Sequence, residues 1–335
     1  MPAGFGPIAG LKIGQAQDIR ARTGCTVFLA ENGMVAACRV LGGAVGEREL
    51  ETMRAGHIAG RIHVLVLAGG SAFGLDAAAG VVRWCEERGI GFDTGLSRDG
   101  SPHTIRVPIV PSAILFDLGV GETTTTFGPG ARPRHPDAAM GYAAAAAASA
   151  AKHDALVAEG RMGVGAGCTV GKLYGMNRAC DAGAGCWTEE LAGGVCVAAF
   201  AAVNAFGDVL DPDTGRILAG ARAAENSREF VDTAAVLCAG GVTLPFGGTH
   251  TGGTNTVLVA VATNAALTHA EAERLAELAA PGMARVLSPA HTQLDGDILF
   301  ALAPAPSGSL PHVDVDDLGR SAAEAVARAI ARGVQ

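Results

Sequence analysis

Runs of consecutive apolar residues mark the most regular elements that the sequence predicts. Ile62–Leu67, Val195–Asn204, Thr256–Thr263 and Ile298–Ala303 are apolar at nearly every position, instead of alternating with polar residues. A strand of this kind has both faces buried, under helices or under a second sheet. We therefore expect sheets that are covered on both sides.

Helix signals occur in several segments, and some of the helix ends can be placed. Thr268 and Glu271 form a capping-box pattern, and Pro136-Asp137 precedes a run of alanines. A surface helix is expected over Glu47–His57. The other helices are expected at Leu75–Arg88, Ala138–Lys152, Ala270–Ala280, Met283–Leu287 and Ser321–Ala331.

Turn residues separate these elements. Asn32-Gly33 lies between the apolar runs Thr26–Ala30 and Met34–Val40, which predicts a hairpin because both turn residues tolerate positive φ. Val107–Leu118 is expected as a strand that Pro111 interrupts. Polar or glycine-rich composition predicts loops over Ser97–Pro108 and Gly119–Pro136.

Composition adds that the core is built from small side chains. Of 335 residues, 49% are hydrophobic but only 4% are aromatic, and 48 are glycine. Such a chain can form a large α/β core of closely apposed backbone. We expect a single domain over residues 1–335. Its mixed order of elements fits a four-layer α-β-β-α sandwich as well as an open doubly wound sheet.

Charge and cysteine usage exclude several functional classes. A net charge of −8 provides no basic surface for nucleic acid or for an anionic membrane. No apolar run reaches the length of a membrane span, and no secretory signal pattern opens the sequence, so we expect a soluble, cytoplasmic protein. The cysteines are expected to be reduced and mostly buried. Cys180 and Cys186, the most closely spaced pair, lack histidines at zinc-site spacing, so no metal is expected.

Two glycine-rich segments resemble catalytic or nucleotide-binding motifs but fail the tests for them. Gly69–Gly74 has phosphate-loop spacing without the following lysine, and Ser71 lacks the last glycine of a nucleophile elbow. Gly163–Lys172 resembles a Walker A loop in which Ala166 replaces the first glycine and Leu173 replaces the magnesium-binding hydroxyl. We therefore interpret Gly69–Gly74 as a tight turn. In the second segment, Lys172 stands at the end of a glycine-rich backbone that can approach other groups closely.

A third glycine-rich segment meets a buried strand at Asn255-Thr256. A threonine hydroxyl is a weak nucleophile, but the amine of an N-terminal threonine has a pKa of about 8 and can act as its base. If the hydroxyl of Thr256 attacked the carbonyl of Asn255, the chain would be cut there and Thr256 would become such a terminus. Gly252 and Gly253 permit the constrained backbone this needs. From the residues alone a simpler interpretation is also open, in which a glycine-rich loop enters a core strand and no cut occurs.

Several segments in register resemble one known family, over roughly residues 10–305. The chain is similar to the self-processing aminopeptidase/D-esterase family of N-terminal-nucleophile hydrolases, which includes β-aminopeptidases and nylon-oligomer hydrolases. The segments that carry the resemblance are Leu67–Asp76, Val107–Pro111, Val203–Asp208, Gly253–Thr256 and Asp295–Phe300.

The resemblance implies a four-layer α-β-β-α fold and a cut between Asn255 and Thr256, which leaves chains 1–255 and 256–335 together. It implies that Thr256 is the nucleophile and that Lys172 keeps the amine of Thr256 neutral and stabilises negative charge. By the same resemblance, Asn204 contributes to the oxyanion site, and the acidic pair Asp295 and Asp297 orients the nucleophile. No cofactor or metal is implied.

What such a protein would act on stays open. Short peptides, β-amino-acid amides and ω-amino-acid oligomers such as 6-aminohexanoate oligomers are the expected substrates, and a tetramer of processed protomers is the expected assembly. His135 precedes Pro136-Asp137, where the nylon-oligomer enzymes are expected to have tyrosine, which makes it a candidate pocket residue. The alternatives are an acyl transferase resembling the ornithine acetyltransferases, or a metabolite-binding protein that never cleaves.

Overall fold

One long strand, β2 (Thr23–Val40), belongs to both halves of the main sheet. The computed structural model describes residues 5, 8–97, 103–122, 133–152, 156–240, 255–306 and 313–335. The amino-terminal half of β2 pairs with β1 and β4, while its carboxyl-terminal half pairs with β16. The strand order is β10-β11-β14-β16-β2-β4-β7-β3, and β1 also pairs with β2. These strands are β1 (Lys12–Asp18), β3 (Glu47–Arg48), β4 (Ile62–Ala68), β7 (Ser112–Ile114), β10 (Ala184–Glu190), β11 (Cys196–Asn204), β14 (Thr256–Thr263) and β16 (Ile298–Ala303).

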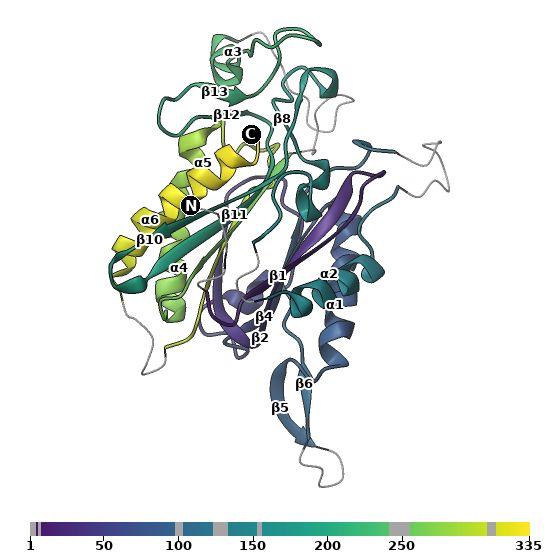
Figure 1. Cartoon of the computed structure of the whole chain (residues 1–335), viewed down its shortest axis with the longest axis vertical. Helices are drawn as coiled ribbons and strands as arrows, with labels where there is room; N and C mark the ends of the chain where they lie inside the picture. Colours follow the sequence, from purple (N-terminus) through teal and green to yellow (C-terminus); the bar gives the residue numbers. More distant parts are fainter. Residues whose placement is uncertain are drawn as a thin grey trace.

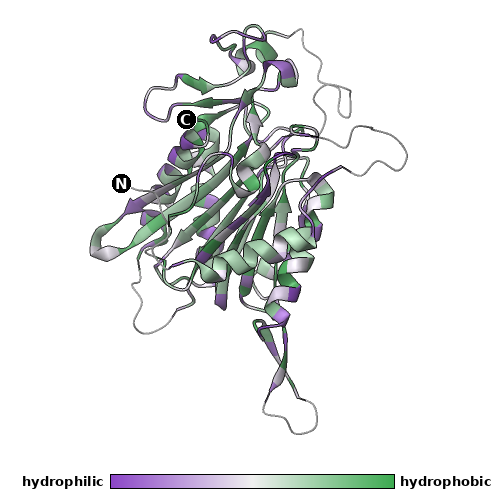
Figure 2. Ribbon diagram, turned by 45° about the vertical axis from the view of Figure 1, so that its right-hand side comes forward, coloured by the Kyte–Doolittle hydropathy of each residue, from purple (hydrophilic) through white to green (hydrophobic). Residues whose placement is uncertain are grey.

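The two halves of this sheet face each other across a shared core. Phe28 of β2 meets Phe200 of β11 edge to face, with ring centroids 5.4 Å apart, although other strands separate β2 from β11 in the sheet. The alternate residues Val27 and Leu29 pack instead against the helices of the opposite face. Successive strand residues point to opposite faces, so each half is buried on both sides. Hydrophobic residues accordingly concentrate on the central strands (Figure 2).

Helices cover both outer faces and complete the expected four-layer sandwich (Figure 1). Helix α2 packs on β1 and β2, and α1 packs on α2 and β4. On the other outer face, α6 packs on β10 and β11, and α4 packs on β16 and on β2. The helices are α1 (Ala77–Glu86), α2 (Ala138–Ala150), α3 (Thr233–Ala239), α4 (His269–Ala279), α5 (Pro281–Val286) and α6 (Val315–Arg332). None of the described helices combines the length and apolar character needed to cross a membrane.

Glycine allows the close approach of α1 and α2. A Cβ atom on Gly80 would lie 1.7 Å from the carbonyl oxygen of Ala138, and one on Gly141 would lie 1.9 Å from that of Ala77. Such distances are impossible for real atoms, so the two helices touch backbone to backbone. This confirms the expectation of a core made from small side chains.

Short elements complete the described structure. The β5–β6 hairpin projects away from the sandwich, and β12, β13 and α3 lie together at the opposite end (Figure 1). The remaining strands are β5 (Phe92–Ser97), β6 (Thr104–Val107), β8 (Thr169–Val170), β9 (Cys180–Asp181), β12 (Asp208–Leu210), β13 (Ile217–Ala219) and β15 (Leu287–Ser288). Short 3-10 helices lie at Leu50–Met53, Ser71–Asp76, Gly163–Gly167, Met176–Arg178 and Ala192–Gly194.

Several sequence expectations were wrong. The expected hairpin at Asn32-Gly33 is a register shift inside β2, where the positive φ of Gly33 accommodates an irregularity and not a reversal. Glu47–His57 contains only β3 and one 3-10 turn. Part of the expected loop Ser97–Pro108 is strand β6. The cysteines are mostly buried, as expected, but Cys238 is exposed.

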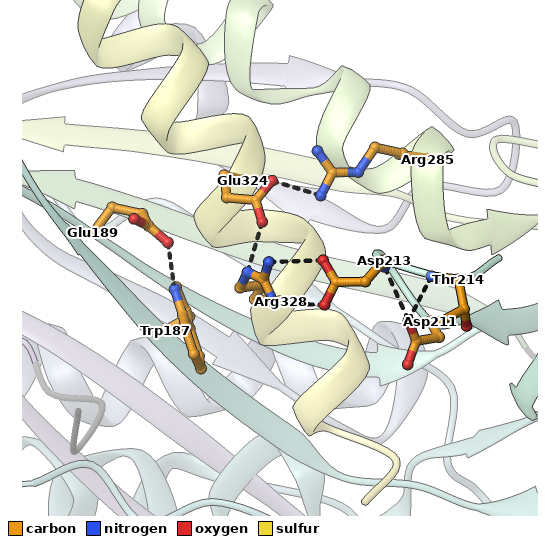
Figure 3. Close-up of polar contacts among 8 residues, drawn as sticks. All are labelled: Trp187, Glu189, Asp211, Asp213, Thr214, Arg285, Glu324 and Arg328. Carbon is orange, nitrogen blue, oxygen red and sulfur yellow. Dashed lines mark hydrogen bonds and ion pairs between the residues drawn. The ribbon is translucent and has the colours of Figure 1, made fainter. Parts of the chain in front are cut away.

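Helix α6 is tied to other parts of the chain by polar contacts (Figure 3). Arg328 forms ion pairs with Glu324 on the same helix and with Asp213, in the turn that joins β12 to β13. Glu324 also pairs with Arg285 of α5. At the end of α6, Arg332 pairs with Glu159. The last helix is therefore bound to segments that precede residue 255.

Candidate active site

Strand β14 begins at Thr256 and brings three distant parts of the chain together. Thr256 pairs with Asn204, the last residue of β11, in antiparallel register. On the other side, Asn255 forms a parallel bridge with Asp295, shortly before β16. The asparagine, the threonine and the acidic pair that the sequence singled out are thus neighbours at one end of the sheet.

The hydroxyl of Thr256 lies against the peptide bond that precedes it. Thr256 is 3% exposed, and its Oγ1 donates a hydrogen bond to the carbonyl oxygen of Asn255 at 2.5 Å. The backbone N–H of Gly296 donates to the same oxygen at 2.9 Å. The Gly296 N–H polarises this carbonyl, and the hydroxyl of Thr256 lies beside it, an arrangement that favours addition of the hydroxyl to the carbonyl carbon.

Only glycine fits at position 296. A Cβ atom there would lie 2.7 Å from Oγ1 of Thr256 and 2.7 Å from the carbonyl oxygen of Ala44. The Asp-Gly-Asp segment therefore combines a close backbone approach with two flanking carboxylates.

The acidic pair holds the backbone around the threonine. Asp297 accepts hydrogen bonds from the N–H of Val257 at 2.8 Å and from the backbone of His291, and its Oδ2 lies 2.9 Å from Nδ1 of that histidine. Asp295 accepts from the N–H of Phe206 at 3.1 Å and from the hydroxyl of Thr292 at 2.5 Å. Burial, together with the charge of Asp297, raises the pKa of Asp295 to about 6.

Lys172 is buried and bound to Asn204. Its ammonium donates to Oδ1 of Asn204 at 2.8 Å and to the backbone carbonyl of the same residue at 3.0 Å. Burial lowers the pKa of Lys172 from 10.5 to about 7, against the attraction of Asp295 and other nearby groups. A lysine with this pKa can exchange protons near neutral pH.

The side-chain amide of Asn204 is held in one orientation. Its Oδ1 also accepts from the N–H of Thr169 at 3.1 Å, and its Nδ2 donates to the carbonyl of Phe116 at 3.0 Å. The oxygen thus faces the lysine, whereas the amide N–H that the oxyanion role requires is directed at least in part toward Phe116.

A cavity of about 380 Å³ opens beside this lysine. Its buried end is lined by Thr169 and Lys172, next to the half-buried Phe116, and its exposed end includes Asn177 and Asp181. Its buried end therefore joins the cluster of Lys172 and Asn204, which adjoins Thr256 through the pairing of β11 with β14.

The sequence did not single out Asp117, a carboxylate next to this cavity. The side chain is 1% exposed, its Oδ1 accepts from the N–H of Gly70 at 2.7 Å, and burial raises its pKa to about 7. A Cβ on Gly69 would lie 2.0 Å from its Oδ2, and one on Gly167 would lie 2.5 Å from its Cβ. The two glycine-rich segments that failed the nucleotide-binding tests thus make room for Asp117.

His135 is not in contact with this cluster. Its ring stacks on Phe73 with centroids 5.3 Å apart, and it lines a separate cavity of about 350 Å³ with Asp18, Thr23 and Asp137. Ser71 belongs to the expected tight turn, where Gly70 and Ser71 both have positive φ. Gly252, Gly253 and Thr254 lie outside the described residues.

Sequence reasoning also missed three other residues that contact the site. His291 and Thr292 bind the acidic pair, and Thr169 binds Asn204. Their only signal in the sequence is proximity to Asp295 and Lys172. Across the part of the chain that the structure describes, no group of three or more His, Cys, Asp or Glu side chains is arranged to hold a metal ion.

The profile of peptidase family S58 matches residues 7–335. The chain belongs to peptidase family S58. It is therefore a hydrolase that acts on peptide or amide bonds. An uncharacterized aminopeptidase of Mycobacterium tuberculosis is 36% identical to this S58 chain over 324 residues, covering 93% of the chain and 85% of the relative. A 6-aminohexanoate-oligomer endohydrolase of Kocuria sp. is 29% identical, covering 88% and 72% respectively.

Solved structures show the fold of this S58 chain. A β-aminopeptidase of Burkholderia sp. superimposes with a TM-score of 0.66 at 22% identity, over 99% of the chain and 86% of the other protein. The L-aminopeptidase D-Ala-esterase/amidase of Ochrobactrum anthropi, described as a variant of the N-terminal-nucleophile hydrolase fold, gives 0.65 at 17% identity, with coverage of 99% and 86%. The predicted family and fold class are confirmed.

Proposed function

We propose that this S58 protein cuts its own chain between Asn255 and Thr256 and then uses Thr256 as the nucleophile of an amidase. The observation that carries the proposal is the buried hydroxyl of Thr256 against the carbonyl of Asn255, whose oxygen also accepts from Gly296. A core strand that begins at this threonine, with a lysine and two carboxylates near its first residue, has more polar groups than a simple loop-to-strand transition needs.

The cut is an acyl shift followed by hydrolysis. Oγ1 of Thr256 adds to the carbonyl carbon of Asn255, the C–N bond breaks, and the hydroxyl proton ends on the nitrogen of Thr256. Water then hydrolyses the ester, which gives a carboxylate on Asn255 and a free amine on Thr256. The N–H of Gly296 stabilises the negative charge that develops on the carbonyl oxygen.

In the processed protein, the new amine serves as the base. It takes the proton from Oγ1 as the hydroxyl attacks the substrate carbonyl, and it returns a proton to the departing amine. Water then releases the acid from the acyl-enzyme. Lys172 lies next to Asn204, opposite Thr256 in the sheet, where a positive charge favours the neutral form of the amine.

Similarity to an aminopeptidase supports substrates with a free amine near the cleaved bond, whereas similarity to a 6-aminohexanoate-oligomer endohydrolase supports oligomers that are cut at an internal amide. We propose short peptides, β-amino-acid amides and ω-amino-acid oligomers. Assays on p-nitroanilides, β-peptides and 6-aminohexanoate oligomers would distinguish these classes.

Denaturing electrophoresis and amino-terminal sequencing test the proposal. The purified chain of 33.5 kDa is expected to give two bands, the smaller one beginning at Thr256. Thr256→Ala should stay full length and lose at least 1,000-fold in activity, on the order of the loss when a nucleophile is removed. Thr256→Ser should still be cut, because serine keeps the hydroxyl.

Thr214→Ala, in an exposed turn, is the matched control and should be processed normally. An uncut wild-type chain that hydrolyses amides would disprove the role of Thr256. Acetyl transfer from acetylornithine to glutamate, without amide hydrolysis, would favour the acyl-transferase alternative.

A further inference from the structure

The cavity beside Lys172 carries an excess of positive charge. Its described lining residues include Arg22, Arg222 and Lys172 and a single carboxylate, Asp181. Asp181 is also shared, because it pairs with Arg22 and with Arg161 outside the cavity. The whole chain has a net charge of −8, so the sign of this cavity is opposite to that of the molecule.

Arg222 is held in place without a carboxylate. Its N–H donates to the carbonyl of Arg178 at 2.9 Å, while Nε of Arg178 donates to the carbonyl of Arg222 at 2.7 Å. The guanidinium of Arg178 stacks on Tyr174, 3.8 Å from the ring centroid. The guanidinium of Arg222 donates only to the carbonyl of Glu225, at 3.3 Å, and forms no ion pair among the described residues.

Arg22 adds a second cation to the cavity. It ends the turn between β1 and β2 with φ of 52°, a left-handed conformation that is uncommon for a side-chain-bearing residue and is often found at binding sites. Its Nη2 contacts Asp181, whereas its buried Nε–H has no hydrogen-bond partner in the part of the chain that the structure describes. This N–H is closed to solvent, so Arg22 contributes its charge to the cavity and not an open donor at Nε.

We propose that this cavity is the subsite for a carboxylate of the substrate, bound by Arg222 and Arg22. The guanidinium fork matches the geometry of a carboxylate, and partial burial strengthens the pairing. The choice of substrate rests on the proposed amidase function: a short peptide or ω-amino acid would present its free carboxylate to the arginines and its amide toward the end of the cavity at Lys172. The protein would then prefer substrates that end in a free acid over the corresponding neutral amides.

Binding can be measured without turnover in the full-length Thr256→Ala variant. Calorimetric titration with alanyl-alanine and with its carboxamide is expected to show about tenfold tighter binding of the free acid, the effect of one charge-assisted pair. Arg222→Gln in this background should remove most of the difference, because Arg22 alone remains, and should leave affinity for the carboxamide within about twofold. Arg161→Gln, which removes an arginine next to the cavity but not in its lining, should preserve the difference.

Equal affinities for acid and carboxamide, no binding of either, or an equal loss of both in Arg222→Gln would overturn the carboxylate subsite. Arg222→Lys is a second variant, which keeps the charge but loses the fork and should retain part of the preference. Hydrolysis of a neutral p-nitroanilide by the wild-type protein is scored separately, so failure of the subsite and failure of the amidase proposal give different results.

Discussion

At the scale of single residues, the site consists of buried polar groups that hold one another. Motif resemblance predicts catalytic roles for Lys172, Asn204, Asp295 and Asp297, and in the structure these residues lie in one cluster with Thr256. Their catalytic roles stay predictions. Spacing alone could not have assembled them, because they are far apart in the sequence. The sequence does not identify Asp117 as a candidate site residue, because a single aspartate after an apolar run matches no motif.

The shifted pKa of Lys172 predicts how stability depends on pH. The unfolded chain keeps a lysine with its ordinary pKa of 10.5, while the folded chain releases the proton at about 7. Between these values the unfolded state binds more protons, so the free energy of unfolding rises with pH. In the Thr256→Ala background, urea denaturation should give about 1–2 kcal/mol more stability at pH 8.5 than at pH 7.

Lys172→Met should remove most of this rise, because the ammonium is absent. Lys152→Met, at an exposed position, is the control and should keep the rise. If the rise persisted in Lys172→Met, the pH dependence would have to come from other groups.

At the scale of elements, the strongly apolar runs and the tight turn at Gly70-Ser71 were predicted well, whereas the hairpin at Asn32-Gly33 was not. The expected strand Thr256–Thr263 coincides with β14, and the capping box opens α4 as expected. At Asn32-Gly33 the local turn preference was correct, since Gly33 has positive φ, but pairing with β4 and β16 keeps β2 extended on both sides. Pairing with distant strands determines whether Asn32-Gly33 forms a hairpin or a bulge, and the local sequence pattern gives no information about that pairing.

Gly141 should be intolerant of a larger side chain. In an exposed helix, Gly→Ala stabilises by about 1 kcal/mol. Here the added methyl would overlap the backbone of α1, so Gly141→Ala is expected to destabilise the protein by about 1–3 kcal/mol. Thermal and urea denaturation measure the change. Ala147→Ser, on the exposed side of α2, should have little effect, and a stabilising Gly141→Ala would contradict the backbone contact.

At the scale of the whole molecule, composition left two architectures open and motif resemblance selected the correct one. The four layers depend on β2 crossing from one half of the sheet to the other, which no property of the isolated segment reveals. The same topology interleaves the proposed fragments: β14 lies between β11 and β16, and β16 pairs with β2.

Processed and unprocessed protein should therefore refold differently. After denaturation and dilution, full-length Thr256→Ala is expected to recover its circular dichroism independently of protein concentration. Processed wild type must bring two chains together, so its recovery should decrease on dilution. Native processed protein, in contrast, should stay active on dilution because its chains share one sheet. Concentration-independent refolding of the processed form would contradict this.

Because β14 lies inside the sheet, folding has to precede the proposed cut and is not easily repeated after it. Before the cut, β14 is covalently connected to the strands between which it folds. After the cut, the folded enzyme stays intact, but an unfolded molecule no longer has that connection to guide refolding. The peptide bond between Asn255 and Thr256 would then be needed only for the first folding of each molecule. The lifetime of each enzyme molecule would be set by how slowly that sheet opens.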